Sequence, residues 1–189
     1  MYRLKEKHKL SAITIRCFDL LKYGYTACLG TSLCNDEGFV AGCEADLEAL
    51  LTMMIVSYLT GEPCWMANPS RIEKNKLVLA HCTIATKMIS KATLLPHMES
   101  GKCVAVRGPL KKGKATLVRF GSGRMQIAVG EIVRSDMQEP DLCRTQVELR
   151  IDDPEKWIEN ALGNHQVLVY GDIKQMLLDF CRFKGIKAI

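Results

Sequence analysis

The sequence predicts a mixed α+β protein built from two parts, and three observations support this. Helix-like and short strand-like segments alternate up to about residue 70. Many short strand-like segments follow, separated by glycine, proline and charged turns, which is typical of an antiparallel barrel or sandwich. The 189 residues are 48% hydrophobic and 25% charged, close to the average for soluble globular proteins, so a sizeable core is expected. We therefore predict the end of an α/β domain over residues 1–70 and a β-rich domain over residues 71–189.

The first part opens with a helix-like fragment over residues 1–10 that carries no capping signal. Residues 11–17 follow at once and are strand-like, because the β-branched residues Ile13, Thr14 and Ile15 stand together. An uncapped helix followed directly by a strand is an unusual way to begin a domain. These residues are therefore expected to be the tail of a larger α/β unit.

A longer helix is predicted over residues 44–59, where apolar residues recur every three or four positions, as a buried helix face requires. These apolar residues are Leu47, Leu50, Leu51, Met54, Ile55 and Tyr58. Gly61 and Pro63 end the helix. A short strand over residues 64–67 follows and ends at Asn68-Pro69. The first part therefore closes with one well-defined helix and a short strand.

The second part combines strands with two helices. Asp153 followed by Pro154 predicts a helix start, because aspartate caps helices and proline suits their first position. A second helix begins near Asp172 and stops at Gly185. The predicted strands cover residues 77–84, 93–95, 103–107, 115–120, 125–133, 145–151, 167–170 and 186–189.

Composition excludes several classes of protein. No apolar stretch reaches 18 residues without a charge, so no membrane span is expected. The N-terminal residues lack the apolar segment of a secretory signal. The net charge is only +5, and aromatic residues make up 6%, which argues against a dedicated nucleic-acid binder.

The nine cysteines do not suggest a disulfide framework. Their number is odd, no CxxC pair occurs, and several lie in apolar segments. Cys82, Cys103 and Cys181 are interpreted as small buried hydrophobic residues. We therefore expect a reducing, cytoplasmic location.

The segment Gly42-Cys43-Glu44-Ala45-Asp46 places two carboxylates at the start of the predicted helix. A helix N-terminus favours ionised carboxylates, and ionised oxygen ligands suit Mg²⁺ or Mn²⁺. Acidic residues in a first turn are equally often structural. The position of Glu44 and Asp46 leaves both interpretations open.

Three histidines are further candidates for a site. His81 lies in an apolar strand-like segment, where a histidine is more often a hydrogen-bonded core residue than a ligand. His97 lies in a loop that looks exposed, and His165 follows Gly163-Asn164 between a helix and a strand. Loop histidines are better functional candidates, because loops on a rigid scaffold carry much of function.

Short motifs along the chain carry a family resemblance. They are IRCFDLL at 15–21, NDEG at 35–38, GCEAD at 42–46, ALLTM at 49–53, WMANP at 65–69, LVLAHC at 77–82, CRTQVE at 143–148, GNH at 163–165 and YGD at 170–172. In this order and spacing they resemble the C-terminal part of the L-fucose and L-arabinose isomerases, and most of all the fucose-isomerase-related proteins. The matches cover about residues 11–189 but less than half of such an enzyme.

The resemblance implies a fold and a reaction. It implies that the first part ends a Rossmann-like domain and that the second part is a small closed antiparallel β-barrel with flanking helices. It also implies interconversion of an aldose and a ketose through an ene-diol, assisted by a divalent metal, usually Mn²⁺. The metal would act as a Lewis acid, and a carboxylate would move the proton between C1 and C2.

Site residues are carried over from the resemblance one by one. It implies that Glu44, Asp46, His81 and His165 are metal ligands and that Asp46 and His165 take part in catalysis. His97 matches a histidine in the following loop and is expected to contact substrate.

The chain departs from the family pattern at three places. Arabinose isomerases carry a glutamate where this chain has Ala67, and fucose isomerases carry a catalytic glutamate within the segment that corresponds to residues 26–33, where this chain has no acid. A second histidine often found after the position of His165 is Gln166 here. Both known sets of site residues are therefore incomplete.

These observations predict a fragment or short relative of an aldose–ketose isomerase that contributes to a metal-assisted site for a monosaccharide. We expect little or no activity from this chain alone, because further N-terminal domains or a partner chain would complete the pocket. Assembly into a homo-oligomer is also expected. The alternative is a non-catalytic module for sugar binding or oligomer assembly.

Overall fold

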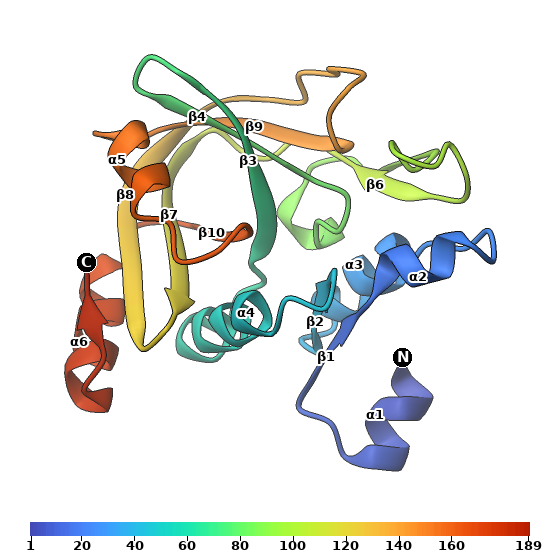
Figure 1. Ribbon diagram of the computed structural model, residues 1–189, viewed down its shortest axis with the longest axis horizontal. Helices are drawn as coiled ribbons and strands as arrows, with labels where there is room; N and C mark the ends of the chain where they lie inside the picture. The colour runs from blue at the N-terminus through green and yellow to red at the C-terminus, as the bar shows by residue number, and fades with distance from the viewer.

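The computed structural model describes residues 1–189. An α/β part lies beside a closed antiparallel barrel, and helices flank the barrel on its outer side (Figure 1). This arrangement confirms the predicted mixed α+β fold with a small closed barrel.

The α/β part is built around a pair of parallel strands. Strand β1 (Ala12–Ile15) pairs in parallel with β2 (Val40–Cys43). Parallel neighbours require a crossover, and the helices between them provide it. The helices of this part are α1 (Tyr2–His8), α2 (Cys17–Leu21), α3 (Cys28–Asp36) and α4 (Leu47–Thr60).

Helix α3 was not predicted from the sequence. Its residues, CLGTSLCND, are weak helix formers, and no side chain caps its first turn. Thr31 and Ser32 are nevertheless fully buried, and Ser32 donates its hydroxyl to the carbonyl of Cys28. Tertiary packing, which local propensity does not report, therefore stabilises this helix.

Helix α4 confirms the predicted helix but begins three residues later, at Leu47. The predicted buried face was wrong: Leu47, Leu51 and Tyr58 are exposed, and the buried apolar residues of the helix are Ala49, Leu50, Met53 and Val56, because apolar residues occur on all sides of this helix and packing selects the face. Asp46 is the N-cap of α4 and accepts a hydrogen bond from the backbone N–H of Ala49 at 2.8 Å. The helix ends at Gly61, whose φ of 72° lies in the left-handed region that glycine adopts readily.

Six strands close the barrel. They follow one another in the order β8, β7, β10, β3, β4 and β9, and β9 pairs with β8 to complete the ring. Their bounds are β3 (Trp65–Glu73), β4 (Lys76–His81), β7 (Gly113–Gly121), β8 (Arg124–Ser135), β9 (Thr145–Arg150) and β10 (Gln166–Tyr170). All six pairings are antiparallel.

Smaller elements surround the barrel. A separate antiparallel pair joins β5 (Thr93–Leu95) to β6 (Ala105–Arg107), and β11 (Lys187–Ala188) runs parallel to the start of β8. A 3₁₀ turn covers Thr86–Met88. The remaining helices are α5 (Pro154–Glu159), with Asp153 as its predicted N-cap, and α6 (Lys174–Lys184).

Strand β3 continues beyond Asn68-Pro69, where the sequence predicted its end. The pairing with β4 shifts register between Pro69 and Arg71, which marks a bulge. Proline is tolerated at such a bulge because it does not have to donate a ladder hydrogen bond there. The first barrel strand thus begins at Trp65, and position 70 falls inside it.

Two hydrophobic clusters form the main core. Eighteen buried residues, among them Trp65, Leu117 and Leu149, form one cluster with members on every barrel strand. The second cluster includes Met53 of α4 and Leu177 of α6, packed with residues of the barrel strands. None of the helices combines the length and the hydrophobicity that a membrane-spanning helix requires.

The cysteines are all free thiols. Cys82 and Cys181 are buried, as predicted. Cys103 is exposed, so its interpretation as a buried hydrophobic residue was wrong. It lies just outside β6, with a left-handed φ of 50°, where the chain turns at the surface.

Candidate metal centre

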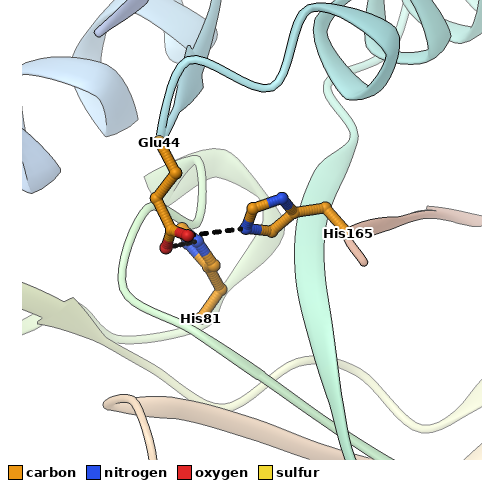
Figure 2. Close-up of side chains that lie close together, drawn as sticks. All are labelled: Glu44, His81 and His165. Carbon is orange, nitrogen blue, oxygen red and sulfur yellow. Dashed lines mark ion pairs between the residues drawn. The ribbon is translucent and has the colours of Figure 1, made fainter. Parts of the chain in front are cut away.

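Three side chains converge between the α/β part and the barrel. The Oε1 atom of Glu44 lies 3.5 Å from Nε2 of His81, and its Oε2 atom lies 3.5 Å from Nε2 of His165. The two imidazole rings meet edge to face, with centroids 5.3 Å apart (Figure 2). One ligand atom from each residue lies within 4.8 Å of the other two. This cluster is called the triad below.

The barrel strands bring the two histidines together. His81 ends β4, and His165 directly precedes β10. Both strands flank β3, where Ala67 pairs with Gln166 and Asn68 pairs with Ala80. The histidines therefore stand on either side of β3 at the same end of the barrel, although they are far apart in the sequence.

Glu44 reaches the triad from the α/β part through an unusual turn. Glu44 and Ala45 have φ values of 57° and 55°, in the left-handed region that L-residues seldom adopt. The N–H of Ala45 donates to the carbonyl of Ile15 at 3.1 Å and holds the turn in place. Strained backbone of this kind tends to collect at functional sites.

Each histidine is oriented through its second ring nitrogen. Nδ1 of His81 lies 2.9 Å from Oγ1 of Thr83, and Nδ1 of His165 lies 3.0 Å from Oδ2 of Asp46. The Nε2 atoms of both histidines are buried and have no hydrogen-bond partner. Histidines that bind metals usually hold their other nitrogen on an oxygen in this way.

The charges of the triad balance one another in the metal-free protein. The imidazoles of His165 and His81, which approach its two oxygens at 3.5 Å, lower the pKa of Glu44 far below its usual value, so Glu44 is a carboxylate. Burial opposes protonation of His165, but Asp46 and Glu44 outweigh it and raise its pKa to about 8. His165 is therefore largely protonated at neutral pH when no cation replaces its proton.

This shift predicts how the stability of the metal-free chain changes with pH. The pKa of His165 is about 8 in the folded protein, against an ordinary 6.5. Its contribution to the free energy of unfolding is therefore fully present below pH 6.5 and is lost as the pH rises through 8. The difference corresponds to about 2 kcal/mol. Urea unfolding with a chelator at pH 6 and pH 9 should show this loss in the wild type and little of it in His165→Gln. Replacing the exposed His8 by glutamine should leave the wild-type pH dependence intact.

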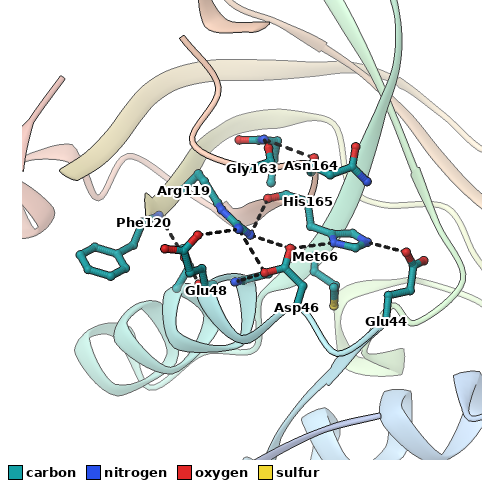
Figure 3. Close-up of polar contacts among 12 residues, drawn as sticks. Glu44, Asp46, Glu48, Met66, Arg119, Phe120, Gly163, Asn164 and His165 are labelled. Atoms are coloured by element: carbon teal, nitrogen blue, oxygen red, sulfur yellow. Dashed lines mark hydrogen bonds and ion pairs between the residues drawn. The ribbon is translucent and has the colours of Figure 1, made fainter. Parts of the chain in front are cut away.

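Asp46 lies behind the triad rather than in it. Its two oxygens accept hydrogen bonds from Nη1 and Nη2 of Arg119 at 3.0 and 3.1 Å (Figure 3). Oδ1 also accepts the capping N–H of Ala49, and Oδ2 contacts His165. Burial opposes ionisation of Asp46, but the bonds from His165 and Arg119 prevail and its pKa is low. The structure thus places Asp46 against a histidine and an arginine, whereas the sequence had suggested a metal ligand and catalytic residue.

His97 does not join the triad either. The loop lies largely at the surface, as expected, but His97 itself is buried, with only 7% of the residue exposed. Its loop folds on itself, with the N–H of His97 donating to the carbonyl of Lys102 and the N–H of Gly101 donating to that of His97. The ring contacts Glu99 at 3.1 Å through Nε2 and Ser100 at 3.2 Å through Nδ1.

Two residues that support the triad were missed in the sequence. Thr83 stands two positions after His81, and Arg119 lies within the apolar strand segment ATLVRF. A charged residue inside an apolar strand was the available signal, because arginine is seldom buried without a partner. The partner itself, Asp46, is 73 positions away and only the fold reveals it.

The donor set of the triad fits a divalent transition metal. One carboxylate and two neutral imidazole nitrogens are ligands that Mn²⁺, Fe²⁺ and Zn²⁺ accept. The buried Nε2 atoms without partners are the observation that supports this fit. Ala67, where a related enzyme would carry a glutamate, is fully buried and offers no further ligand.

Comparison with known proteins supports a relation to sugar isomerases. No family model matches the chain. The chain is 25% identical over 206 residues to a sulfoquinovose isomerase from Clostridium sp. (strain MSTE9). The match covers 95% of this chain but only 44% of that protein, so the chain spans less than half the length of this relative. The similarity does not single out fucose isomerases among the sugar isomerases.

Proposed function

We propose that this chain supplies the metal-holding part of an aldose–ketose isomerase that acts on a monosaccharide. The observation that carries this proposal is the convergence of Glu44, His81 and His165, with both Nε2 atoms buried, facing Glu44 and without a hydrogen bond. The similarity to a sugar isomerase supports the reaction class. The resemblance of the sequence motifs to the fucose and arabinose isomerases implies Mn²⁺ as the cation.

The residues of the chain divide into ligands and supports. The carboxylate of Glu44 and the Nε2 atoms of His81 and His165 would hold the cation. When bound, the cation supplies Lewis acidity at adjacent sugar oxygens and stabilises the negative charge of the ene-diolate. Thr83 and Asp46 hold the Nδ1 atoms and keep each ring turned towards Glu44.

We do not assign the proton transfer on the sugar to Asp46. Both oxygens of Asp46 are already engaged in contacts with Arg119, His165 and Ala49. Helix α3, which covers most of the segment where fucose isomerases carry a catalytic glutamate, contains no acid before Asp36. Further N-terminal domains or a partner chain would therefore supply the proton-transfer group and most of the sugar contacts. This also accounts for the expected low activity of the chain alone.

Metal binding tests the proposal directly. Titration calorimetry with Mn²⁺ should show one site per chain in the wild type. Loss of an orienting outer partner costs about 10–100-fold in metal affinity, so loss of a ligand in Glu44→Gln or His81→Gln should cost more than roughly 100-fold. Glu99→Gln is the matched control, because Glu99 also pairs with a buried histidine but lies outside the triad. Absence of saturable Mn²⁺ binding, or an equal loss in Glu99→Gln, would contradict the assignment.

The engagement of Asp46 with Arg119, His165 and Ala49 favours a second candidate, a non-catalytic sugar-binding or assembly module. This candidate predicts that the protein binds Mn²⁺ and a sugar but does not convert aldoses, even when the further N-terminal domains or the partner chain are present.

A further inference from the structure

Arg119 is a buried cation that contacts three residues on two segments around the triad. Its side chain is only 3% exposed. Nη1 and Nη2 form a fork on the two oxygens of Asp46, and Nη1 also donates to the backbone carbonyl of His165 at 3.0 Å (Figure 3). Nη2 lies 3.5 Å from Oε2 of Glu48 on the first turn of α4. One guanidinium thus meets the start of α4, the Asp46 cap and the segment that carries His165.

This arrangement crosses the boundary between the two parts of the molecule. Asp46 lies two residues after Glu44 and belongs to the α/β part, whereas Arg119 and His165 belong to the barrel. The triad takes one ligand from the first part and two from the second. The distances from Glu44 to His81 and His165 therefore depend on how the start of α4 sits on the barrel, which is where Arg119 binds.

The surroundings are shaped for a guanidinium. A Cβ added to Gly163 would lie 2.3 Å from Nη2 and 2.6 Å from Cζ of Arg119, so the absence of a side chain at Gly163 makes room for the arginine head. Lysine carries a single nitrogen and cannot form the fork on Asp46 together with the bond to the His165 carbonyl. The geometry therefore uses features that arginine alone provides.

We infer that Arg119 is the positioning residue of the metal site: it fixes Asp46 and the backbone of His165 so that the His165 ring presents Nε2 to Glu44. This inference deepens the proposed function and rests on it for the role of the metal. The orientation that it assigns to His165 can be observed without metal.

The experiment compares Arg119→Met and Arg119→Lys with Glu48→Gln and Leu177→Ala. Glu48→Gln removes the second, half-exposed carboxylate but leaves the fork on Asp46, and Leu177→Ala destabilises the core at helix α6, which contributes no residue to the triad. Two quantities are measured: the Mn²⁺ affinity of the folded protein, and, in the metal-free protein, the NMR cross-relaxation between the ring protons of His81 and His165.

Arg119→Met should lower Mn²⁺ affinity about 10–100-fold and remove the cross-relaxation signal. Arg119→Lys should retain only part of the Mn²⁺ affinity and of the cross-relaxation signal. The two control variants should keep the affinity and the signal at wild-type levels. If Arg119→Met does not fold, Gly163→Ala tests the same point, because it displaces the guanidinium without removing its charge. Gly163→Ala should lower the Mn²⁺ affinity and weaken the cross-relaxation signal, as Arg119→Met does.

The outcomes separate this inference from the proposed function. Wild-type affinity and an unchanged ring signal in folded Arg119→Met would overturn the inference and leave the proposed function intact. If the wild type binds no Mn²⁺, the proposed function fails, and the ring signal still decides whether Arg119 positions His165. A loss of affinity in Leu177→Ala equal to that in Arg119→Met would also overturn the inference, since stability alone would then explain the effect.

Discussion

Asp46→Ala is expected to lower the free energy of unfolding by about 3–5 kcal/mol, because it leaves the guanidinium of Arg119 buried without its main partner. Arg119 is almost fully enclosed and cannot turn to water. The change also removes the N-cap of α4 and the partner of Nδ1 of His165. Urea denaturation of the metal-free protein at constant pH measures the effect.

Asp153→Ala is the matched control. Asp153 caps α5 in the same way, accepting the N–H of Lys156 at 3.0 Å, but takes part in no ion pair. Its replacement should cost about 1 kcal/mol, the usual effect of losing a cap. The difference between the two variants reports the contacts of Asp46 with Arg119 and with His165 together, and similar losses in both would contradict the role assigned to Asp46 and Arg119.

Gly130→Ala should destabilise the barrel where β8 pairs with β9. An added Cβ would lie 2.3 Å from the backbone oxygen of Arg150 and 2.7 Å from Cγ2 of Ile151. Backbone cannot move aside as a flexible side chain would, so relief requires opening the β8–β9 pairing that closes the ring. A loss of about 3 kcal/mol is expected, at the upper end for overpacked sites.

Gly30→Ala supplies the comparison for that substitution. Gly30 lies inside helix α3, and its added Cβ would meet only the flexible side chain of Met1, at 3.2 Å. Alanine is favoured over glycine within a helix by roughly 0.5–1 kcal/mol, so this variant should match or exceed wild-type stability. Thermal and urea unfolding of both variants check the pair, and equal destabilisation would argue against the close approach at Gly130.

The barrel and the existence of helix α4 could be predicted because α4 is rich in apolar residues and the barrel strands are rich in β-branched residues between turns. The buried face of α4 was not predicted, since apolar residues occur on all its sides and only packing selects the side with Met53 and Val56. The crossover helix α3 escaped prediction because its stability comes from burial of Thr31 and Ser32, not from its own residues. The continuation of β3 past Pro69 was missed for a related reason, since the bulge that accepts proline is a property of the pairing with β4.

The candidate site was predictable in composition but not in the roles of its members. The sequence pointed to Glu44, Asp46, His81 and His165, partly from their positions and partly from a family resemblance. It could not separate the two carboxylates, because the left-handed turn at Glu44 and Ala45 is what sends one towards the histidines and the other behind them. The burial of His97 within a surface loop was not predicted, because it depends on backbone hydrogen bonds of Lys102, Gly101 and His97 that fold the loop on itself.

The division of the triad between the two parts has a consequence for cooperativity. A cation held by Glu44 on one side and by His81 and His165 on the other would act as a reversible cross-link between segments 37 and 121 residues apart in the chain. Such a link restricts the partly unfolded states in which one part opens while the other stays folded. Amide hydrogen exchange of α4 and of the barrel strands should therefore converge towards one common opening free energy as the cation concentration rises.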